Sequence, residues 1–184
     1  MLSKEQVKKI CAGIKNARIG IIGDFCVDIY WHADMRKSEL SRETPHYPLP
    51  IVGERVYLGA GGNVAANLAA LAPKELFAVS LIGGDWRGML MEDIFERSGM
   101  NRDFVIKAPD RFTNAYCKPM RKGISELEYE DPRLDFGNYE PISKETENRV
   151  IENLRKVAEN IDVLCVADQF MFGIITKRVR DEII

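Results

Sequence analysis

Three short, uninterrupted apolar runs constrain the fold of this chain more than any other feature of its sequence. They lie at residues 19–22, 77–82 and 163–167, and each is followed directly by glycine or aspartate. Strands without polar alternation are typical of a sheet that is covered on both faces. Because helical patterns separate the runs, we expect an α/β fold, a doubly wound, mostly parallel sheet with helices on both faces.

Helix start and stop signals frame the segments between these runs. Ser3 and Gln6 have the spacing of a capping box. Asp85 and Ser143 each precede an amphipathic pattern and are suitable N-caps, and Gly99 is suited to end the helix that follows Asp85. The sequence therefore predicts helices that begin just after residues 3, 85 and 143.

Two segments do not fit a covered parallel sheet. Residues 33–58 carry three prolines and then an alternating pattern, which is typical of irregular chain followed by an edge strand. Residues 111–136 have a hairpin pattern with Gly123 near the turn. We predict that these segments form a small β-layer inserted into a single domain that spans residues 1–184.

Composition narrows the function classes. Apolar residues make up 46% and charged residues 29% of the 184 positions, an ordinary balance for a soluble domain. The net charge is −2 with mixed signs along the chain, which argues against nucleic acid as the main partner. No apolar run reaches the ~18 residues of a membrane span, and we expect no signal peptide because the N-terminus is amphipathic.

Cysteine and histidine are too scattered for a zinc site. The four cysteines, Cys11, Cys26, Cys117 and Cys165, form no C-x-x-C pair, and the sequence has two histidines. Cys26 and Cys165 lie in or beside apolar runs, which favours buried thiols. We expect no metal site in this chain and a cytoplasmic location.

Carboxylates follow the predicted strands. Asp24 and Asp28 come after the first apolar run, and Asp168 follows the last one. Ligands of open α/β sheets bind beyond the carboxyl ends of the strands, so these groups are candidates to accept bonds from hydroxyl groups. The simpler interpretation, that Asp24 caps a turn and Asp28 lies on the surface, stays open.

A small-residue turn, Gly59-Ala-Gly-Gly-Asn63, opens a predicted helix. No Lys-Ser/Thr follows it, which excludes a P-loop, and Val64 replaces the third glycine of a dinucleotide fingerprint. Free N–H groups at a helix start, with the amides of Asn63 and Asn67, suit a polyhydroxylated or anionic small molecule. An equally good interpretation of the sequence is that Gly59, Gly61 and Gly62 only let the helix pack closely on a strand.

The order of these motifs resembles that of a known family. Gly23-Asp24 with Asp28-Ile-Tyr-Trp31, residues 59–67, and Gly84-Asp85-Trp-Arg-Gly88 resemble the N-terminal half of the ribokinase-like (PfkB) carbohydrate kinases. Arg42-Glu-Thr-Pro45 and Leu134-Asp-Phe136 are most similar to the heptose-phosphate kinase branch of bacterial ADP-heptose synthesis. The resemblance runs over nearly the whole chain.

The resemblance implies a fold with a β-sheet lid that covers the sugar and often pairs two subunits, so a homodimer through the lid is expected. In this family the residues at the positions of Asp28 and Asn63 bind sugar hydroxyls, and Gly61 and Gly62 supply backbone contacts. Gly59, Asn67 and Asp24 are expected beside them. Asp168 is a further candidate, although its surroundings depart from the family's Asp-Tyr-x-Lys-Gly.

The implied reaction transfers the γ-phosphoryl group of ATP, with Mg²⁺, to a sugar or sugar-phosphate hydroxyl. The family's catalytic base is the Asp of a Gly-Ala-Gly-Asp motif, which does not occur in this sequence. We therefore expect ATP and Mg²⁺ to bind mainly outside this chain. The chain itself is then either a fragment of a kinase or a natural short product. A sugar phosphate would need basic residues, and the candidates are Arg42, Arg55, Lys118, Arg121 and Arg133.

Two other functions remain. The chain could be a non-catalytic small-molecule-binding or assembly module made of this half of the fold alone. A dinucleotide-binding oxidoreductase is disfavoured by the broken glycine fingerprint and by Ser80 at the position where the acidic residue is expected.

Overall fold

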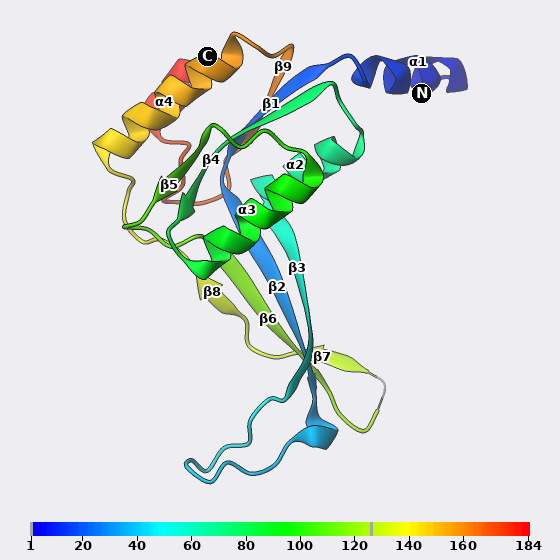
Figure 1. Ribbon diagram of the computed structural model, residues 1–184, viewed down its shortest axis with the longest axis vertical. Coiled ribbons are helices and arrows are strands. Elements are labelled where there is room, and N and C mark those ends of the chain that lie inside the picture. The colour runs from blue at the N-terminus through cyan, green and yellow to red at the C-terminus, as the bar shows by residue number, and fades with distance from the viewer. Residues whose placement is uncertain (1, 126) are drawn as a thin grey trace.

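The computed structural model contains two β-sheets, and helices pack on the first of them (Figure 1). It describes residues 2–125 and 127–184. Met1, which belongs to the predicted domain, and Glu126, which belongs to the predicted hairpin segment, lie outside the described residues.

The first sheet is parallel throughout. Its strand order is β5 (Val105–Ala108), β4 (Glu75–Gly83), β1 (Arg18–Gly23) and β9 (Val163–Ala167). The three apolar runs are therefore strands of one parallel sheet, as predicted, and β5 is an additional strand at its edge. Because all four strands run in one direction, their carboxyl ends meet at the same edge of the sheet.

Helices cover both faces of the first sheet, which confirms the doubly wound α/β prediction (Figure 1). α2 (Gly61–Ala70) and α3 (Trp86–Ser98) pack in the core that contains Ile21. α4 (Lys144–Ala158) and α5 (Lys177–Ile183) pack in the core that contains Ile22. Successive strand residues point to opposite faces, so these two adjacent side chains, both 0% exposed, serve two different cores.

The predicted helix caps are confirmed. Ser3 and Gln6 form a reciprocal capping box at the start of α1 (Lys4–Ile14). The Asp85 carboxylate accepts from the N–H of Gly88 at 3.0 Å, and the Ser143 hydroxyl accepts from the N–H of Thr146 at 3.1 Å. Each bond satisfies one N–H that has no partner within its helix.

α1 differs from the other helices in that none of its residues is buried. Figure 1 shows it extending away from the first sheet. In the described part of the chain, no helix combines the length and the apolar character that a bilayer crossing requires.

The second sheet has the order β3 (Ile51–Ala60), β2 (Phe25–Asp34), β6 (Ala115–Lys122) and β7 (Glu128–Glu130), and β8 (Leu134–Phe136) also pairs with β6. β2 and β6 are parallel, and the other pairs are antiparallel. A short 3-10 turn, Met35–Lys37, follows β2. The predicted β-layer thus exists, but its central strand β2 begins at Phe25, well before the predicted segment.

The two faces of the second sheet have different roles. Phe25, Val27 and Ile29 of β2 point into the core beneath α2 and α3, and we call this side the inner face. Asp28 and Tyr30 alternate with them and define the outer face. The outer face is therefore the side of this sheet that carries polar groups.

Asp24 is the single residue between β1 and β2, and its main chain joins two further elements. Its N–H donates to the carbonyl oxygen of Ala167 at the end of β9, at 3.0 Å. Its carbonyl oxygen accepts from the N–H of Gly61, the first residue of α2, at 2.8 Å. The crossing from the first sheet to the second is thus tied to β9 and to α2.

The Asp24 carboxylate organises the loop between β9 and α5. One oxygen accepts from the N–H groups of Gln169 and Phe170, at 3.0 and 2.8 Å, and the other accepts from the N–H of Ile174 at 2.8 Å. Gly173 packs directly on the carboxylate, where a Cβ would overlap it. The side chain is only 3% exposed, so the fold depends on this charged group being satisfied by backbone donors.

We predict that Asp24→Asn lowers the free energy of unfolding by about 2–4 kcal/mol, because an amide turns an NH₂ group toward backbone donors. Chemical denaturation checks this, with Asp103→Asn on the surface as the matched control. Equal stability of the two variants would contradict the role assigned to Asp24.

Candidate functional site

The glycine-rich turn lies where β3 ends and α2 begins. A Cβ on Gly59 would come within 2.6 Å of the Cys26 sulfur and 2.8 Å of an Asp28 carboxylate oxygen. A Cβ on Gly61 would lie 2.9 Å from the Ala167 side chain, and one on Gly62 would lie 3.1 Å from Leu58. Each of the three glycines is therefore in close contact with other protein atoms, and a Cβ on Gly61 would meet the backbone carbonyl oxygen of Asp24 as well, at 2.9 Å.

The main chain of the turn has a partner within the protein. The resemblance implies that Gly61 and Gly62 supply backbone contacts to a sugar, and the N–H of Gly61 donates to the carbonyl oxygen of Asp24 at 2.8 Å. Gly61 and Gly62 are both buried, so the close-packing interpretation accounts for them. Gly59 differs, because its missing side chain leaves room for the Asp28 carboxylate beside it.

Ala60, between these glycines, has a backbone conformation that alanine rarely adopts. Its φ is 52° and its ψ is −132°, and it serves as the N-cap of α2 without a side-chain capping bond. A Cβ in this region is strained, typically by about 1–3 kcal/mol. The entrance of α2 is thus held in a strained turn by the contacts of its neighbours.

Asp28 is the predicted site residue whose carboxylate lies on the outer face. Lys118 of β6 donates to it at 3.1 Å and to the Tyr30 hydroxyl at 3.0 Å. The Lys118 ammonium also lies 4.6 Å from the centre of the Tyr30 ring. Burial lowers the pKa of Lys118, but the bonds to Tyr30 and Asp28 outweigh it, so its pKa is raised and it stays charged.

The strand registers place Asp28 in a row across the second sheet. Asp28 pairs with Tyr57 of β3 and with Tyr116 of β6, and Tyr116 pairs in turn with Asp135 of β8. Paired residues of neighbouring strands share a face, so all four side chains lie on the outer face. Sequence reasoning did not connect them, although alternation in β2 and β6 was the available signal.

Cys26 precedes Asp28 by two residues on β2, so the two side chains are on the same face, and Cys26 pairs with Gly59 of β3. Burial and the Asp28 carboxylate raise the pKa of its thiol to about 12, so it is an uncharged packing group. Cys26 is buried as predicted, whereas Cys165 is only half-buried.

Asn63 and Asn67 both lie on the exposed side of α2, one turn apart. The Asn67 side-chain amide donates to the carbonyl oxygen of Asn63 at 2.9 Å. It also lies 3.5 Å from the side-chain oxygen of Asn63, an orientation that directs the Asn63 NH₂ away from Asn67. Asn67 therefore serves its own helix, while Asn63 keeps an exposed side chain four residues beyond Gly59.

Two predicted site carboxylates are engaged elsewhere. Asp24 is buried and already accepts three backbone N–H groups, which removes it from the candidate site. Asp168 forms an ion pair with Arg180 of α5 at 2.5 Å. Asp24 thus bonds to a loop, as the capping interpretation expects. The structure brings Asp28 together with Gly59, Lys118 and Tyr116, and Asn63 lies on the helix that follows Gly59.

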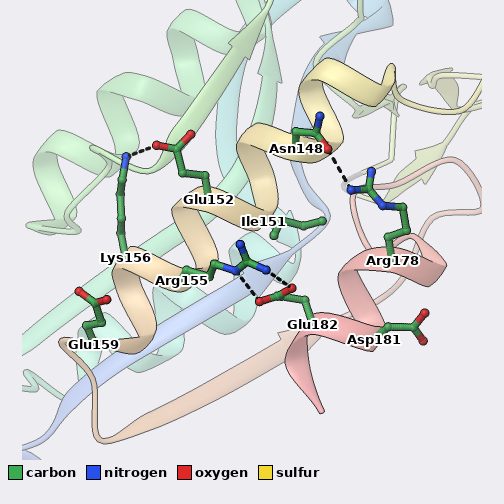
Figure 2. A pocket seen from close by; sticks show the side chains of 9 residues that line it. All are labelled: Asn148, Ile151, Glu152, Arg155, Lys156, Glu159, Arg178, Asp181 and Glu182. Carbon is green, nitrogen blue, oxygen red and sulfur yellow. Dashed lines mark hydrogen bonds and ion pairs between the residues drawn. The ribbon is translucent and has the colours of Figure 1, made fainter.

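A hollow of about 560 Å³ lies between α4 and α5, two helices that are far from the glycine turn in the sequence (Figure 2). Its charged side chains largely satisfy one another. Arg155 pairs with Glu182 at 2.6 Å, and Lys156 pairs with Glu152 at 2.6 Å. Figure 2 shows the Arg155–Glu182 pair between the two helices and the Lys156–Glu152 pair along α4 itself, so the hollow offers little uncompensated charge to a ligand.

No group of three or more His, Cys, Asp or Glu side chains among residues 2–125 and 127–184 is arranged to hold a metal ion. No chemical step is assigned to Mg²⁺ or ATP within this chain.

Comparison with known proteins gives relatives along the whole chain. No family model matches the sequence. The chain is 26% identical over 183 residues to the bifunctional protein HldE of Geobacter metallireducens, covering 100% of this chain and 36% of that protein. It is 27% identical to the Geobacter sulfurreducens HldE, covering 94% of this chain and 33% of that protein. The chain thus spans about a third of the length of these relatives.

Solved structures share the fold. A carbohydrate kinase from Agrobacterium tumefaciens matches with a TM-score of 0.58 at 18% identity, over 82% of this chain and 45% of that one. Arabidopsis thaliana ribokinase, complexed with ribose and ATP, matches with a TM-score of 0.51 at 16% identity, over 81% of this chain and 53% of that one. The fold is therefore ribokinase-like, and the resemblance seen in the motifs is confirmed.

We predict that Ala60→Gly raises the free energy of unfolding by about 1 kcal/mol, because glycine tolerates the positive φ. Ala66→Gly, inside α2, is the control and should lower it by about 1 kcal/mol. Thermal and chemical unfolding measure both effects. A loss of stability in Ala60→Gly equal to that of the control would show that the turn is not strained.

Proposed function

We propose that this chain forms the sugar-binding part of an ATP-dependent carbohydrate kinase. The acceptor is a sugar or sugar phosphate, with heptose 7-phosphate as the specific candidate. Similarity to HldE proteins along the region of their heptose 7-phosphate kinase domain supports this, as does the fold shared with sugar kinases. The structural observation that supports this proposal most directly is the position of the Asp28 carboxylate. It lies on the outer face against Gly59 and is held by Lys118.

In this proposal residues 1–184 are one part of a single kinase domain, and the second sheet is the lid. Asp28 and Asn63 bind hydroxyl groups of the acceptor, and Gly59 gives Asp28 the space to do so. A lid that covers the acceptor excludes water and so limits hydrolysis of ATP. The γ-phosphoryl transfer itself needs a base and a nucleotide site that we assign to residues outside this chain.

The structure narrows the candidates for binding a sugar phosphate. Arg55 and Lys118 both pair with Tyr30, so they share the outer face with Asp28. Arg133 lies 4.2 Å from the centre of the Tyr116 ring on that face. Arg121 pairs with Ala33, which alternates with Asp28 and Tyr30, so Arg121 does not share the outer face and is a poor candidate. We therefore propose Arg55, Lys118 and Arg133 as the groups nearest to an acceptor phosphate.

The alternative of a non-catalytic binding module requires a ligand but no phosphoryl transfer. The similarity to sugar kinases favours the kinase. Within the kinase proposal, the protein works in the cytoplasm, where ATP is available.

We predict that Asp28→Ala and Asn63→Ala each weaken binding of heptose 7-phosphate by about 5- to 150-fold, since each removes roughly 1–3 kcal/mol of hydrogen bonding. Calorimetric titration measures this, with mannose 6-phosphate and ribose as comparison ligands. Asp131→Ala is the matched control, because Asp131 pairs with Arg121 away from the outer face. Wild-type affinity in both test variants would refute the site.

We further propose a homodimer through the second sheet. β3 is an edge strand of this sheet, and its exposed side chains include Ile51, Val52 and Tyr57, at 48%, 54% and 51% exposure. Unpaired edges with apolar side chains favour association. We predict that the wild-type chain is a dimer by light scattering and that Val52→Glu shifts it to the monomer. A monomeric wild type, or a dimeric variant, would contradict this.

A further inference from the structure

An aromatic cavity adjoins the candidate site on the outer face of the second sheet. Its volume is about 260 Å³, near the lower end of small-molecule sites and suited to a single sugar ring. Its lining comes from β6, β8, the loop after β8 and the loop after β9. The aromatic members are Tyr116, Phe136, Tyr139, Phe170 and Phe172.

The walls of this cavity are held by specific bonds. The N–H of Phe170 donates to the Asp24 carboxylate at 2.8 Å, and its ring meets Tyr116 edge to face, with ring centres 6.3 Å apart. The Asn138 side chain accepts from the N–H of Phe112 and donates to its carbonyl oxygen, which fixes the residue before Tyr139. The aromatic groups are therefore placed before any ligand arrives.

Two residues that line the cavity lie in the same cross-strand row as Asp28. Tyr116 lines the cavity and is also the cross-strand neighbour of Asp28, and Asp135, on the far side of Tyr116, lines it as well. Burial raises the pKa of Tyr116, with Cys26, Asp135 and Asp28 adding to the effect, so its hydroxyl stays protonated and able to donate. A molecule bound to Asp28 would therefore extend directly onto the aromatic walls.

The chemistry of the lining selects one kind of group. Its polar members, Asn114, Asp135 and Asn138, offer amides and a carboxylate, and the residues that line it include no Lys, Arg or His. Aromatic faces carry partial negative charge and attract the slightly positive C–H groups of a sugar ring. The Asp135 carboxylate is paired with Arg133 at 2.6 Å, and Arg133 lies over the Tyr116 ring. The basic residues Arg55 and Lys118 lie along the sheet beside Tyr30 instead.

We propose that this cavity receives the C–H face of the acceptor's pyranose ring, and that Phe170 with Tyr139 determines which sugars fit. The inference rests on the proposed function and adds which sugars the site accepts. Ring hydroxyls are directed to Asp28 and Asp135, and a phosphate group is directed to the basic residues beside Tyr30. Sugars with an uninterrupted C–H face are preferred over sugars whose axial hydroxyl groups interrupt that face.

The test compares Phe170→Leu, which keeps apolar volume but removes the ring, with Tyr139→Leu and with the control Tyr129→Leu on β7. The probes are heptose 7-phosphate, mannose 6-phosphate, mannose, glucose and ribose. Calorimetry gives affinities, and saturation transfer from aromatic protons reports contact with ring C–H groups. We expect Phe170→Leu and Tyr139→Leu to weaken pyranose binding about 3- to 10-fold and to reduce the transfer, while Tyr129→Leu changes neither.

The outcomes separate this inference from the proposed function. If both cavity variants fold, bind pyranoses within twofold of wild type and keep the transfer, while Asp28→Ala abolishes binding, the cavity inference is overturned and the proposed function stands. If the wild-type chain binds none of the five probes, the proposed function is overturned and the inference with it. A thermal unfolding midpoint for each variant shows that it is folded, and Tyr139, 75% exposed, is the position where substitution least disturbs packing.

Discussion

The Asp24 carboxylate holds this structure together at the point where its two sheets meet. Asp24 lies between β1 and β2, and its main-chain N–H and carbonyl oxygen bond to β9 and to the start of α2. Its carboxylate bonds to the loop that leads to α5. A buried carboxylate is costly unless donors surround it, and here three backbone N–H groups do so. Because Gly173 and Gly61 pack against Asp24, larger residues at either position would separate these segments.

The candidate site follows from that junction. The crossing at Asp24 starts β2 so that Asp28 alternates away from the buried Val27 and Ile29 and reaches the outer face. The same carboxylate holds Phe170 beside Tyr116, which makes one wall of the aromatic cavity. Lys118 then fixes Asp28 from the neighbouring strand. One structural interaction thus positions both the polar and the aromatic parts of the site, while Asp24 itself is buried and bonded to the loop.

Much of the first sheet could be predicted from the sequence because its signals are local. Continuous apolar runs, the caps at Ser3 and Asp85, and the terminating Gly99 depend on neighbours a few residues away. The strand β2 was missed because it begins only one residue after β1. The alternation of Val27, Asp28 and Ile29 was therefore interpreted as a turn with two carboxylates. The motif order was sufficient to identify the ribokinase-like resemblance.

The site was only partly predictable, because its geometry depends on distant pairing. Which of Asp24 and Asp28 faces a ligand is decided by the loop at residues 169–174 and by β6, not by the local sequence. Likewise, the sequence leaves open whether the glycines of the turn serve packing or a ligand, and the contacts of Gly61 with Ala167 and of Gly62 with Leu58 come from distant parts of the fold or from the preceding strand. Amide chemical-shift mapping of the labelled chain, titrated with heptose 7-phosphate, tests the account most directly. It predicts shifts at residues 26–30, 57–63 and 114–118, whereas shifts confined to the hollow between α4 and α5 would contradict it.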